Sequence, residues 1–549
     1  MRGSLLSAFA TCVCVLSLRL CSGLQQGQTR WTRGGSGSVG QLLALRSADE
    51  TTLGAPQSRP QDGSYVSGSG VQVDFTISDA DSAKEIDSLI TLLDDHKGVL
   101  LTSSYEFPGR YARWSVGFVA PALQIEGRGL EFTVTALNVR GVVLCDILRS
   151  RLSADGATFA LDNSATSDPR LIRGKVIPSA QYFSEEERSK QKSLFSLVRA
   201  VRETFASPNA GQLGLYGALG YDLTFQFEPI ELKKDRDEDQ RDLVMFLPDE
   251  ILIVDNQKND AWRIKYEFSV DAKTTKGLDR VASESKFVSA KPDTKFEARD
   301  QPKGAYAKSV IRAKEEFRVG NLFEVVLSQA FREKLNAKPS DIFKRLCRRN
   351  PAPYGFFMNL GASEYLVGAS PEMFVRVENT RKGLRVETCP ISGTIERGGD
   401  PLEDAQQIKK LLLNPKEESE LTMCTDVDRN DKSRICLPGS VRVLGRRQIE
   451  MYSRLIHTVD HVEGYLRAGF DALDAFLCHT WAVTVTGAPK TWAIRFIEEM
   501  EPGARHWYGG AVGIVGFDGT LNTGLTLRTI RIKNGIAEVR AGATLLLDR

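Results

Sequence analysis

The chain has almost no net charge and few long apolar runs. Lys and Arg number 72 and Asp and Glu number 70, which leaves a formal net charge of +2. Nucleic-acid-binding domains carry a basic excess or an arginine-rich arm, and neither is present. Beyond the first thirty residues, no apolar run approaches the ~20 residues needed to span a bilayer. We therefore expect no nucleic-acid partner and, once a targeting segment is removed, no membrane partner.

The cysteines lack the spacing of a structural framework. None of the nine forms a C-x-x-C pair. Three of them, Cys12, Cys14 and Cys21, lie in the apolar N-terminal stretch, and the others are far apart in the sequence. This pattern argues against a disulfide scaffold or a zinc ribbon and favours a reducing compartment. With 42% hydrophobic and 26% charged residues in 549, and no dominant low-complexity tract, the composition is that of a globular protein with more than one core.

Residues 1–48 have the composition of a targeting segment. Arg2 precedes an apolar run from Leu5 to Leu18, which is followed by small residues, as in a signal peptide. The next stretch contains Arg, Ser and Gly and no acidic residue before Asp49, as in a transit peptide. The two in series predict a plastid reached through the secretory route. The alternative is plain secretion, which the scattered cysteines make less favourable.

Two halves follow the targeting segment. Residues 65–288 mix short β-rich runs with a helical pattern, SLFSLVRAVRETFA, and residues 289–305 are a polar stretch with little periodicity. We predict an N-terminal domain over 65–288, a linker over 289–305 and a C-terminal domain over 306–549. The C-terminal domain ends in a predicted β-meander with turns at Asp518-Gly519 and Asn534-Gly535, the dipeptides that favour tight hairpins. The fold class expected is α+β, with large antiparallel sheets and flanking helices.

Several familiar sites are excluded. No G-x-x-x-x-G-K-[ST] motif occurs. TDVDRND (425–431) begins like a calcium loop, but Asp431 stands where the glycine belongs and Leu437 where the closing glutamate belongs. His457 and His461 are four residues apart, yet their β-branched surroundings favour a strand, and a metal clip there is disfavoured.

Polar groups at apolar positions suggest a site for a small polycarboxylate with a hard cation. In the expected strand LTLRTIRI, Arg528 shares a face with Ile530 and Ile532, and a guanidinium there needs an anion. An internal salt bridge is the simpler alternative. Tyr508-Gly509-Gly510 leaves backbone N–H groups for an anion beside a phenol, although glycines also mark bulges. Glu417, Glu418 and Glu420 lie at helical spacing and read either as cation ligands or as an exposed acidic turn.

The order of motifs from 306 onwards resembles the chorismate-utilising enzymes. The motifs, in order, are NPAPYGFFM (350–358), VGASPEMFVRV (367–377), PISGT (390–394), ESELTMCTDVDRND (418–431), SRLIHTVDHVEG (453–464), VTVTGAPK (483–490), YGGAVG (508–513), LTLRTIRI (525–532) and AGATLL (541–546). The chain is most similar to anthranilate synthase component I, in the subclass fused to its glutaminase. Residues 65–288 resemble the N-terminal half of that family more loosely.

The resemblance implies that ammonia adds to the chorismate ring as the 4-hydroxyl leaves, and that pyruvate is then lost to give anthranilate. It implies Mg²⁺ as cofactor with Glu420 as a ligand, and His457 as the histidine associated with the elimination. The implied substrate contacts are the side chains of Tyr508, Arg528 and Thr484 and the backbone of Gly393, Thr394, Gly542 and Ala543.

Two positions distinguish branches of the family. Isochorismate- and salicylate-forming members carry a lysine base where this chain has Glu324, and aminodeoxychorismate synthases often carry a nucleophilic lysine where it has Ser392. Both positions favour anthranilate as the product. Ser103, Pro353, Tyr354 and Gly355 match the tryptophan-binding elements of feedback-regulated members, although 353–355 is also consistent with a simple turn entering a strand.

The resemblance stops short of the family pattern at the C-terminus. Family members continue past AGATLL with an acidic segment that supplies a further Mg²⁺ ligand and then a long helix, and the sequence given ends at Arg549. We expect a truncated form of a longer, glutaminase-fused protein. Three functions therefore stand at this point: an anthranilate synthase large subunit using ammonia from a glutamine amidotransferase; an aminodeoxychorismate synthase or other chorismate enzyme; and a truncated, inactive relative that binds tryptophan or a partner.

Overall fold

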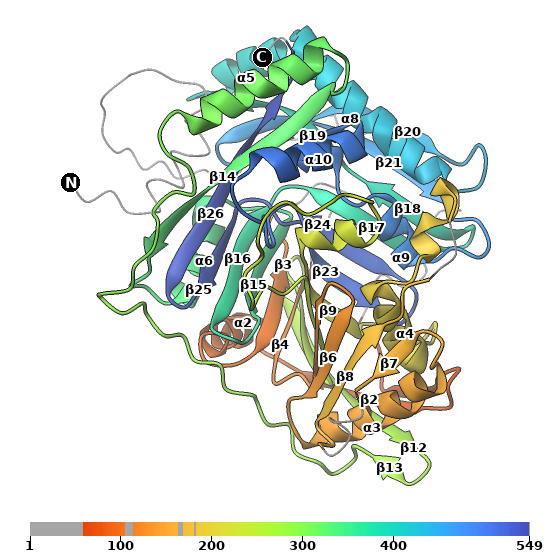
Figure 1. The fold of residues 1–549 in the computed structure, drawn as a ribbon. Helices are drawn as coiled ribbons and strands as arrows, with labels where there is room; N and C mark the ends of the chain where they lie inside the picture. The colour runs from red at the N-terminus through yellow and green to blue at the C-terminus, as the bar shows by residue number, and fades with distance from the viewer. Residues whose placement is uncertain (1–58, 105–113, 163–167, 180–182, 548–549) are drawn as a thin grey trace.

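A computed structural model describes residues 59–104, 114–162, 168–179 and 183–547 (Figure 1). The predicted targeting segment 1–48 lies outside the described residues. None of the six described cysteines is part of a disulfide. In this part of the chain no helix is both long and apolar enough to cross a membrane.

The described chain folds around two antiparallel sheets of 13 strands each. The first runs in the order β1 (Gly63–Val66), β2 (Gln72–Asp79), β12 (Asp260–Val270), β11 (Glu250–Asp255), β4 (Trp114–Val119), β3 (Gly98–Thr102), β15 (Tyr354–Asn359), β16 (Glu364–Ser370), β25 (Thr529–Lys533), β26 (Ile536–Leu545), β14 (Glu324–Lys334) and β22 (Gly487–Ala488), with β13 (Lys273–Thr274) beside β12. The second runs β19 (Ile391–Glu396), β21 (Leu455–Tyr465), β18 (Gly383–Thr388), β17 (Met373–Thr380), β24 (Leu521–Leu525), β23 (Ala511–Gly516), β9 (Gly214–Leu219), β10 (Leu243–Leu247), β5 (Leu123–Arg128), β6 (Glu131–Ala136), β8 (Leu171–Val176) and β7 (Phe159–Leu161), with β20 (Arg442–Met451) beside β21.

The two sheets pack face to face over one large apolar core. Phe118 of the first sheet meets the rings of Tyr216 and Phe246 of the second edge to face, at centroid distances of 5.4 and 6.4 Å. Strands buried on both faces read as continuous apolar runs, which explains LVMFL over β10. The α+β fold class with large antiparallel sheets is therefore confirmed.

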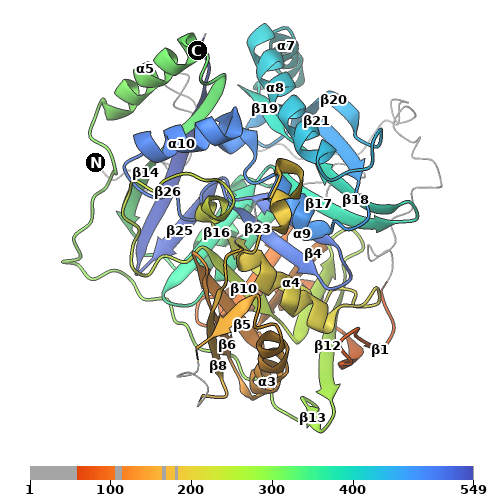
Figure 2. The ribbon, with the colours of Figure 1, turned by 45° about the vertical axis from the view of Figure 1, so that its right-hand side comes forward.

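Helices cover the outer faces of the sandwich (Figures 1 and 2). On the first sheet, α2 (Ser82–Leu92) and α6 (Pro339–Arg349) bury a second apolar cluster. On the second sheet, α3 (Val139–Ala154), α4 (Leu194–Phe205) and α9 (Ala472–Cys478) pack into the main core. The predicted helical pattern SLFSLVRAVRETFA forms α4, which begins at a capping box built on Ser193.

The remaining helices lie at the end of the molecule that carries the predicted site. There α5 (Ala305–Arg318) and α10 (Lys490–Met500) pack on β14, while α7 (Pro401–Leu412) and α8 (Pro415–Ser433) pack on β19 and β21 (Figure 2). Asn414 caps α8 by accepting the Lys416 N–H, and Pro415 occupies its first turn, where a missing N–H costs nothing.

Strands from both sides of residues 289–305 enter each sheet. β3 pairs with β15, and β9 pairs with β23. Residues 289–304 contain no helix and no named strand, and α5 begins at Ala305. The division into domains at this linker stays a prediction.

The C-terminal β-meander was predicted wrongly. Both tight turns form, at Asp518-Gly519 and Asn534-Gly535, but β23 and β24 belong to the second sheet and β25 and β26 to the first. The segment expected to be one strand, LTLRTIRI, instead breaks between Leu525 and Thr529 and crosses from one sheet to the other. A meander within a single sheet and two hairpins in facing sheets give the same alternating pattern, so the sequence did not distinguish them.

Candidate active site

Arg528 occupies the crossover between the two sheets. Its φ is +48°, in the left-handed region that non-glycine residues rarely adopt. The expectation that it lies on a core-facing strand row with Ile530 and Ile532 is therefore wrong, because the strand begins only at Thr529. The second expectation, that an internal salt bridge satisfies this residue, also fails: among the described residues Arg528 has a histidine, and no carboxylate, as its side-chain partner. The crossover thus presents a half-buried guanidinium that lacks an ionic partner.

His457 joins Arg528 to the PISGT segment. It lies on β21, almost fully buried, with Nε2 3.0 Å from Arg528 Nη2 and Nδ1 2.8 Å from Thr394 Oγ1. Burial, with a smaller contribution from the Arg528 cation, lowers the pKa of His457 to about 3. A neutral ring accepts at Nε2 from the guanidinium and donates from Nδ1. His457 and Thr394 are paired across β21 and β19, so the sheet register itself fixes this contact.

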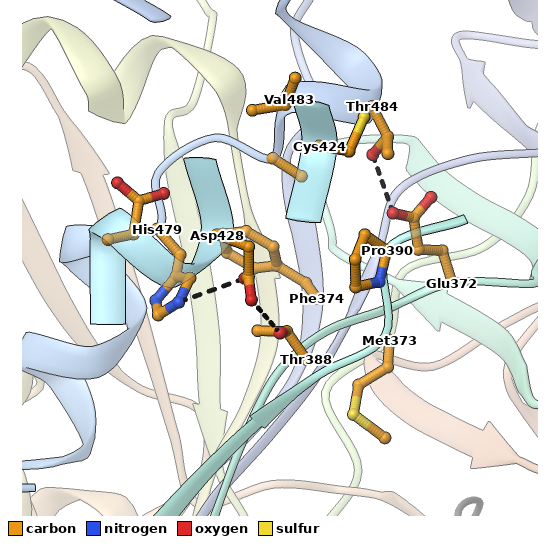
Figure 3. A pocket seen from close by; sticks show the side chains of 12 residues that line it. Glu372, Met373, Phe374, Thr388, Pro390, Cys424, Asp428, His479, Val483 and Thr484 are labelled. Carbon is orange, nitrogen blue, oxygen red and sulfur yellow. Dashed lines mark hydrogen bonds and ion pairs between the residues drawn. The ribbon is translucent and has the colours of Figure 1, made fainter. Parts of the chain in front are cut away.

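Glu372 is a site residue that the sequence analysis missed. It follows β16 in the segment VGASPEMFV and is 3% exposed, and Thr484 Oγ1 donates to its Oε1 at 2.8 Å (Figure 3). Burial raises the pKa of Glu372 to about 8, although the Thr484 hydrogen bond and the Arg528 cation act against this rise. A carboxyl group that keeps its proton near neutral pH is suited to general acid catalysis. The sequence feature that could have identified Glu372 is that it is a lone glutamate between two apolar β-rich runs.

The two buried glutamates predicted from the sequence lie near each other and near Glu372. Glu324 begins β14 and is fully buried, and the Cys424 thiol of α8 lies 3.9 Å from its Oε2. Burial raises the pKa of Cys424, and the carboxylates of Glu324, Glu420 and Glu372 add to the rise. All three carboxyl groups therefore act on the pKa of one thiol, although they come from three different parts of the chain.

Glu420 and Glu417 form the acidic part of the site. Glu420 is 5% exposed, so the alternative of an exposed acidic turn is wrong for this residue. The Lys416 ammonium contacts Glu420 and lies 3.1 Å from Glu417. Gly393 faces the same place: its φ is +85°, a Cβ there would overlap the Thr458 hydroxyl, and Glu417 Oε2 would be 3.4 Å away.

Glu417 and Glu420 supply two carboxylates for Mg²⁺, but both are already paired with the Lys416 ammonium, so they fit the ion only in part. Among the described residues there is no cluster of three His, Cys, Asp or Glu that could hold a metal. Mg²⁺ commonly binds to one or two protein carboxylates and completes its shell with waters and substrate oxygens. The donor set of Glu417 and Glu420 is consistent with that kind of site.

Tyr508 and the AGATLL strand form a second side of the site. Tyr508 is half-buried, and a Cβ on Gly542 would lie 2.6 Å from its hydroxyl. Gly542 and Ala543 are exposed or half-buried on β26. The expectation that Gly509 and Gly510 offer free N–H groups is wrong, because these donate to the carbonyls of Thr526 (3.3 Å) and Trp507 (3.0 Å). Both donors of this segment are therefore used, one within the turn and one by the segment that follows β24.

The residues expected to bind tryptophan also come together. β3 and β15 pair with Thr102 opposite Gly355, and Ser104 exchanges hydrogen bonds with Ala352. Ser103 therefore lies beside the 353–355 segment. Tyr354 begins β15, with its ring against Gly524 and its hydroxyl 3.1 Å from Asn522 Oδ1.

The structure also shows the surroundings of the two motifs that the sequence analysis set aside, the His457–His461 pair and TDVDRND. His461 lies on the same strand as His457, but its Nε2 is 2.9 Å from Glu387 Oε1. The two histidines on this strand therefore have different partners. The calcium-loop-like TDVDRND segment is helical, within α8, and Asp428 is bonded there to Thr388 and Lys432.

Comparison with known proteins identifies the class to which this fold and site belong. A sequence profile of the chorismate binding enzymes matches residues 158–548. This match covers more than half of the chain, and the chain belongs to that family.

Individual relatives give a more specific match. The chain is 52% identical over 480 residues to "Anthranilate synthase" of Azospirillum brasilense, covering 87% of this chain and 64% of that protein. It is 32% identical to "Anthranilate synthase component 1" of Acetivibrio thermocellus, covering 66% of this chain and 77% of the other. The chain thus spans less than two thirds of the length of the A. brasilense protein.

Solved structures support the fold. Anthranilate synthase component I from Streptococcus pneumoniae superposes with a TM-score of 0.56 at 24% identity, covering 81% of this chain and 89% of that chain. The menaquinone-specific isochorismate synthase of Escherichia coli gives a TM-score of 0.57 at 15% identity, with coverages of 90% and 92%.

Proposed function

We propose that this protein is the large subunit of an anthranilate synthase. It would convert chorismate and ammonia to anthranilate, pyruvate and water. The observation that carries the proposal is the 52% identity, over most of this chain, to a protein named anthranilate synthase. The site is consistent with it, since it offers a guanidinium with no carboxylate partner among the described residues, a protonated carboxyl group and a neutral imidazole within one cluster.

Arg528 is the group suited to hold a carboxylate of chorismate. A half-buried guanidinium with no ionic partner binds an anion more strongly than one already neutralised, because no existing pair has to be broken. Its left-handed backbone at the sheet crossover fixes its direction. Tyr508 lies in the same catalytic region and supplies a hydroxyl beside Gly542.

Glu372 is the candidate general acid. When ammonia adds to the ring, a double bond shifts and the 4-hydroxyl leaves, and this group departs most easily as water. Glu372, with its pKa of about 8, still holds a proton at pH 7 and can give it to the departing oxygen. The Thr484 hydroxyl donates to Oε1 of this carboxyl group and so orients the group.

His457 is the candidate base for the second step. Loss of pyruvate requires removal of a ring proton as the ether C–O bond breaks, and the imidazole is already neutral. A substrate carboxylate bound to Arg528 would offset the positive charge that lowers the pKa of His457. Substrate binding thereby raises the basicity of the ring.

Glu420 and Glu417 would hold Mg²⁺. Bound there, the ion would supply positive charge for a carboxylate of the substrate. Gly393 is kept free of a side chain where it faces these residues, and its conformation and crowding both require glycine.

Ammonia would come from a glutamine amidotransferase, either as a partner or as part of a longer chain. The A. brasilense relative is longer than this chain. Glu324 and Ser392, which replace the lysines of other branches, support anthranilate over isochorismate or aminodeoxychorismate as the product.

Product analysis tests the proposal. The purified protein is incubated with chorismate, Mg²⁺ and ammonium, and anthranilate fluorescence and pyruvate are followed together. Equal amounts of the two are expected. Pyruvate-free aminodeoxychorismate would move the protein to the folate branch, and absence of turnover by a folded, chorismate-binding protein would refute the activity.

We propose further that tryptophan inhibits the enzyme at the β3–β15 junction. The ring of Tyr354 lies on Gly524, and Gly524 pairs with Met373, the residue after Glu372. Movement of Tyr354 would therefore reach the candidate acid through one strand pair. Inhibition by tryptophan that Ser103→Phe abolishes without changing kcat supports this; unchanged inhibition refutes it.

The compartment to which residues 1–48 direct the protein also stays a proposal. Its signal-like and transit-like parts favour a plastid reached through the secretory route. Fusion of residues 1–48 to a fluorescent protein in plastid-bearing cells would separate plastid import from plain secretion.

A further inference from the structure

A buried ion pair lies where four site-bearing segments meet. Glu501 is the C-cap residue that follows α10 and Arg505 lies four residues further on, and both side chains are at most 2% exposed. Arg505 Nη2 is 2.6 Å from Glu501 Oε1, and its Nε is 3.0 Å from Oε2. The pair is therefore bidentate, a geometry that an arginine can make and a lysine cannot.

The arginine holds the backbone of two site segments. Its Nη1 donates to the carbonyl of Val485 at 2.7 Å, and its Nη2 donates to the carbonyl of Val326 at 2.6 Å. Val485 is the residue after Thr484, and Val326 is two residues after Glu324. A single planar guanidinium thus sets the distance between the hydroxyl that binds Glu372 and the strand that carries Glu324.

The glutamate holds the strand opposite the AGATLL segment. Its Oε1 accepts from the N–H of Ser328 at 2.7 Å and from the Ser328 hydroxyl at 2.9 Å. Ser328 is the register partner of Gly542 in the β14–β26 ladder. Arg540 of β26 donates to Glu501 Oε2 and to the Ser328 hydroxyl, both at 2.9 Å. The carboxylate is therefore bound by both strands of the ladder.

Tyr508 packs on the same pair. The Arg505 guanidinium carbon lies 5.4 Å from the centre of the Tyr508 ring and 4.8 Å from that of Tyr221. The Tyr508 N–H also donates to the Arg505 carbonyl at 3.0 Å. Cation–π contact and backbone bond together hold the phenol so that its hydroxyl faces Gly542.

Helix stability does not explain the position of Glu501. A carboxylate at the C-terminal end of a helix meets the negative end of the helix dipole, which is unfavourable. Two arginines offset that cost here, and desolvating a group of this size is itself expensive. The arrangement is understandable if its role is to fix the relative position of the segments it binds.

We propose that Glu501 and Arg505 are positioning residues of the active site, which hold Thr484, Glu324, Tyr508 and the Gly542–Ala543 strand in one geometry. This inference rests on the proposed function, because those segments matter only if they contact the substrate. Neither residue need touch the substrate itself. Misplacement of reacting groups by about 1 Å costs on the order of 100-fold in rate.

Three graded variants test the proposal. Arg505→Lys keeps the positive charge but loses the bidentate guanidinium geometry. Glu501→Gln keeps the shape of the side chain but loses its negative charge. Ser328→Ala removes one hydroxyl. We expect kcat/KM for chorismate to fall about 10- to 100-fold in the first two and a few-fold in the third. Because Thr484 orients Glu372, we also expect the alkaline limb of the pH–rate profile to shift in Arg505→Lys, a change that destabilisation alone would not produce.

A neighbouring ion pair provides the matched control. Glu498 lies one turn earlier on α10 and pairs with Arg236 at 3.0 Å, with side chains 5% and 10% exposed. It binds the 233–236 loop and none of the four segments. Glu498→Gln and Arg236→Lys should lower the midpoint of thermal unfolding comparably while changing kcat/KM by less than about 3-fold.

The outcomes separate the two proposals. If the wild-type protein turns over chorismate and the Glu501, Arg505 and Ser328 variants, folded by circular dichroism, behave like the controls, the positioning role is wrong. If the wild-type protein does not turn over chorismate, the proposed function fails instead. Should Arg505→Lys or Glu501→Gln not fold, Ser328→Ala decides: an unchanged kcat/KM in that variant overturns the proposal.

Discussion

His457 Nε2 lies 3.0 Å from Arg528 Nη2, so a neutral imidazole forms one unit with a guanidinium that has no carboxylate partner in the described part of the chain. Burial lowers the pKa of both groups, and the Arg528 cation lowers that of His457 further. Burial and, to a smaller extent, the arginine keep the ring unprotonated, and the ring accepts from one donor of the arginine. An anion that binds the arginine therefore changes the proton affinity of the histidine.

Replacing His457 should remove turnover without unfolding the protein. We expect His457→Gln to lower kcat by about 10²- to 10⁴-fold, the range for loss of a general base. His461→Gln is the matched control, because His461 is also buried on β21 but bonds to Glu387. Steady-state kinetics with anthranilate fluorescence measures both. Similar kcat values in the two variants would contradict the role of His457.

Activity should decline as the pH rises through about 8. The pKa of Glu372 is raised to about 8, so the acid form is lost above that pH. Rates must be compared at constant free ammonia, because ammonia itself becomes more available at high pH. A rate that stays flat to pH 9.5 would exclude Glu372 as the acid.

The same shift predicts that stability, like activity, falls as the pH rises. Between its unfolded pKa of about 4.5 and its folded pKa of about 8, Glu372 is protonated in the folded state and ionised in the unfolded state. Stability therefore falls as the pH rises through this window, by about 3 kcal/mol at pH 7. Glu372→Gln should remove that loss and raise the unfolding midpoint at pH 8 while abolishing most activity. Urea unfolding at pH 5 and pH 8 measures the difference, and a wild-type–variant difference independent of pH would contradict it.

Adding a methyl group at Gly393 should disturb the acidic part of the site. Gly393 has φ +85°, and its Cβ would overlap the Thr458 hydroxyl. Gly439 has φ +77°, and a methyl group added there would meet no atom within 4 Å, which makes it a control for backbone strain alone. Both alanine variants should lose about 1 kcal/mol of stability from strain, but only Gly393→Ala should also lose activity and require more Mg²⁺. Equal activity in the two variants would show that crowding at Gly393 is unimportant.

Two neighbouring substitutions should move the Mg²⁺ requirement in opposite directions. Glu420→Gln removes a candidate ligand, and the Mg²⁺ concentration for half-maximal rate should rise about 10-fold. Lys416→Gln removes the ammonium that contacts Glu420, and because a competing positive charge is lost, that concentration should fall a few-fold. Chelation with EDTA should abolish turnover in all forms. A Mg²⁺ requirement that neither substitution changes would show that Glu420 is not a ligand.

Much of the fold could be predicted from the chain because local patterns are strong there. The helix over SLFSLVRAVRETFA follows from the spacing of its apolar residues and from its Ser193 cap. The helix-then-strand order of α5 and β14 and the two tight turns also follow from local sequence. The assignment of β24 and β25 to different sheets does not, because the alternation of side chains is the same whichever sheet a strand joins.

The chemistry divides in the same way. The sequence by itself determined the family, since nine motifs occur in one order, and it determined which residue types are available: an arginine, two histidines and several glutamates in otherwise apolar surroundings. Only the tertiary structure decided which of these residues are paired, buried or protonated. It placed Arg528 at the crossover without an ionic partner and buried Glu372 enough to keep its proton. It separated His457 from His461 by giving each a different partner, and it brought Glu501 and Arg505 under four segments at once. Desolvation and pairing depend on which distant segments surround a side chain, and that information does not reside in the neighbouring residues of the chain.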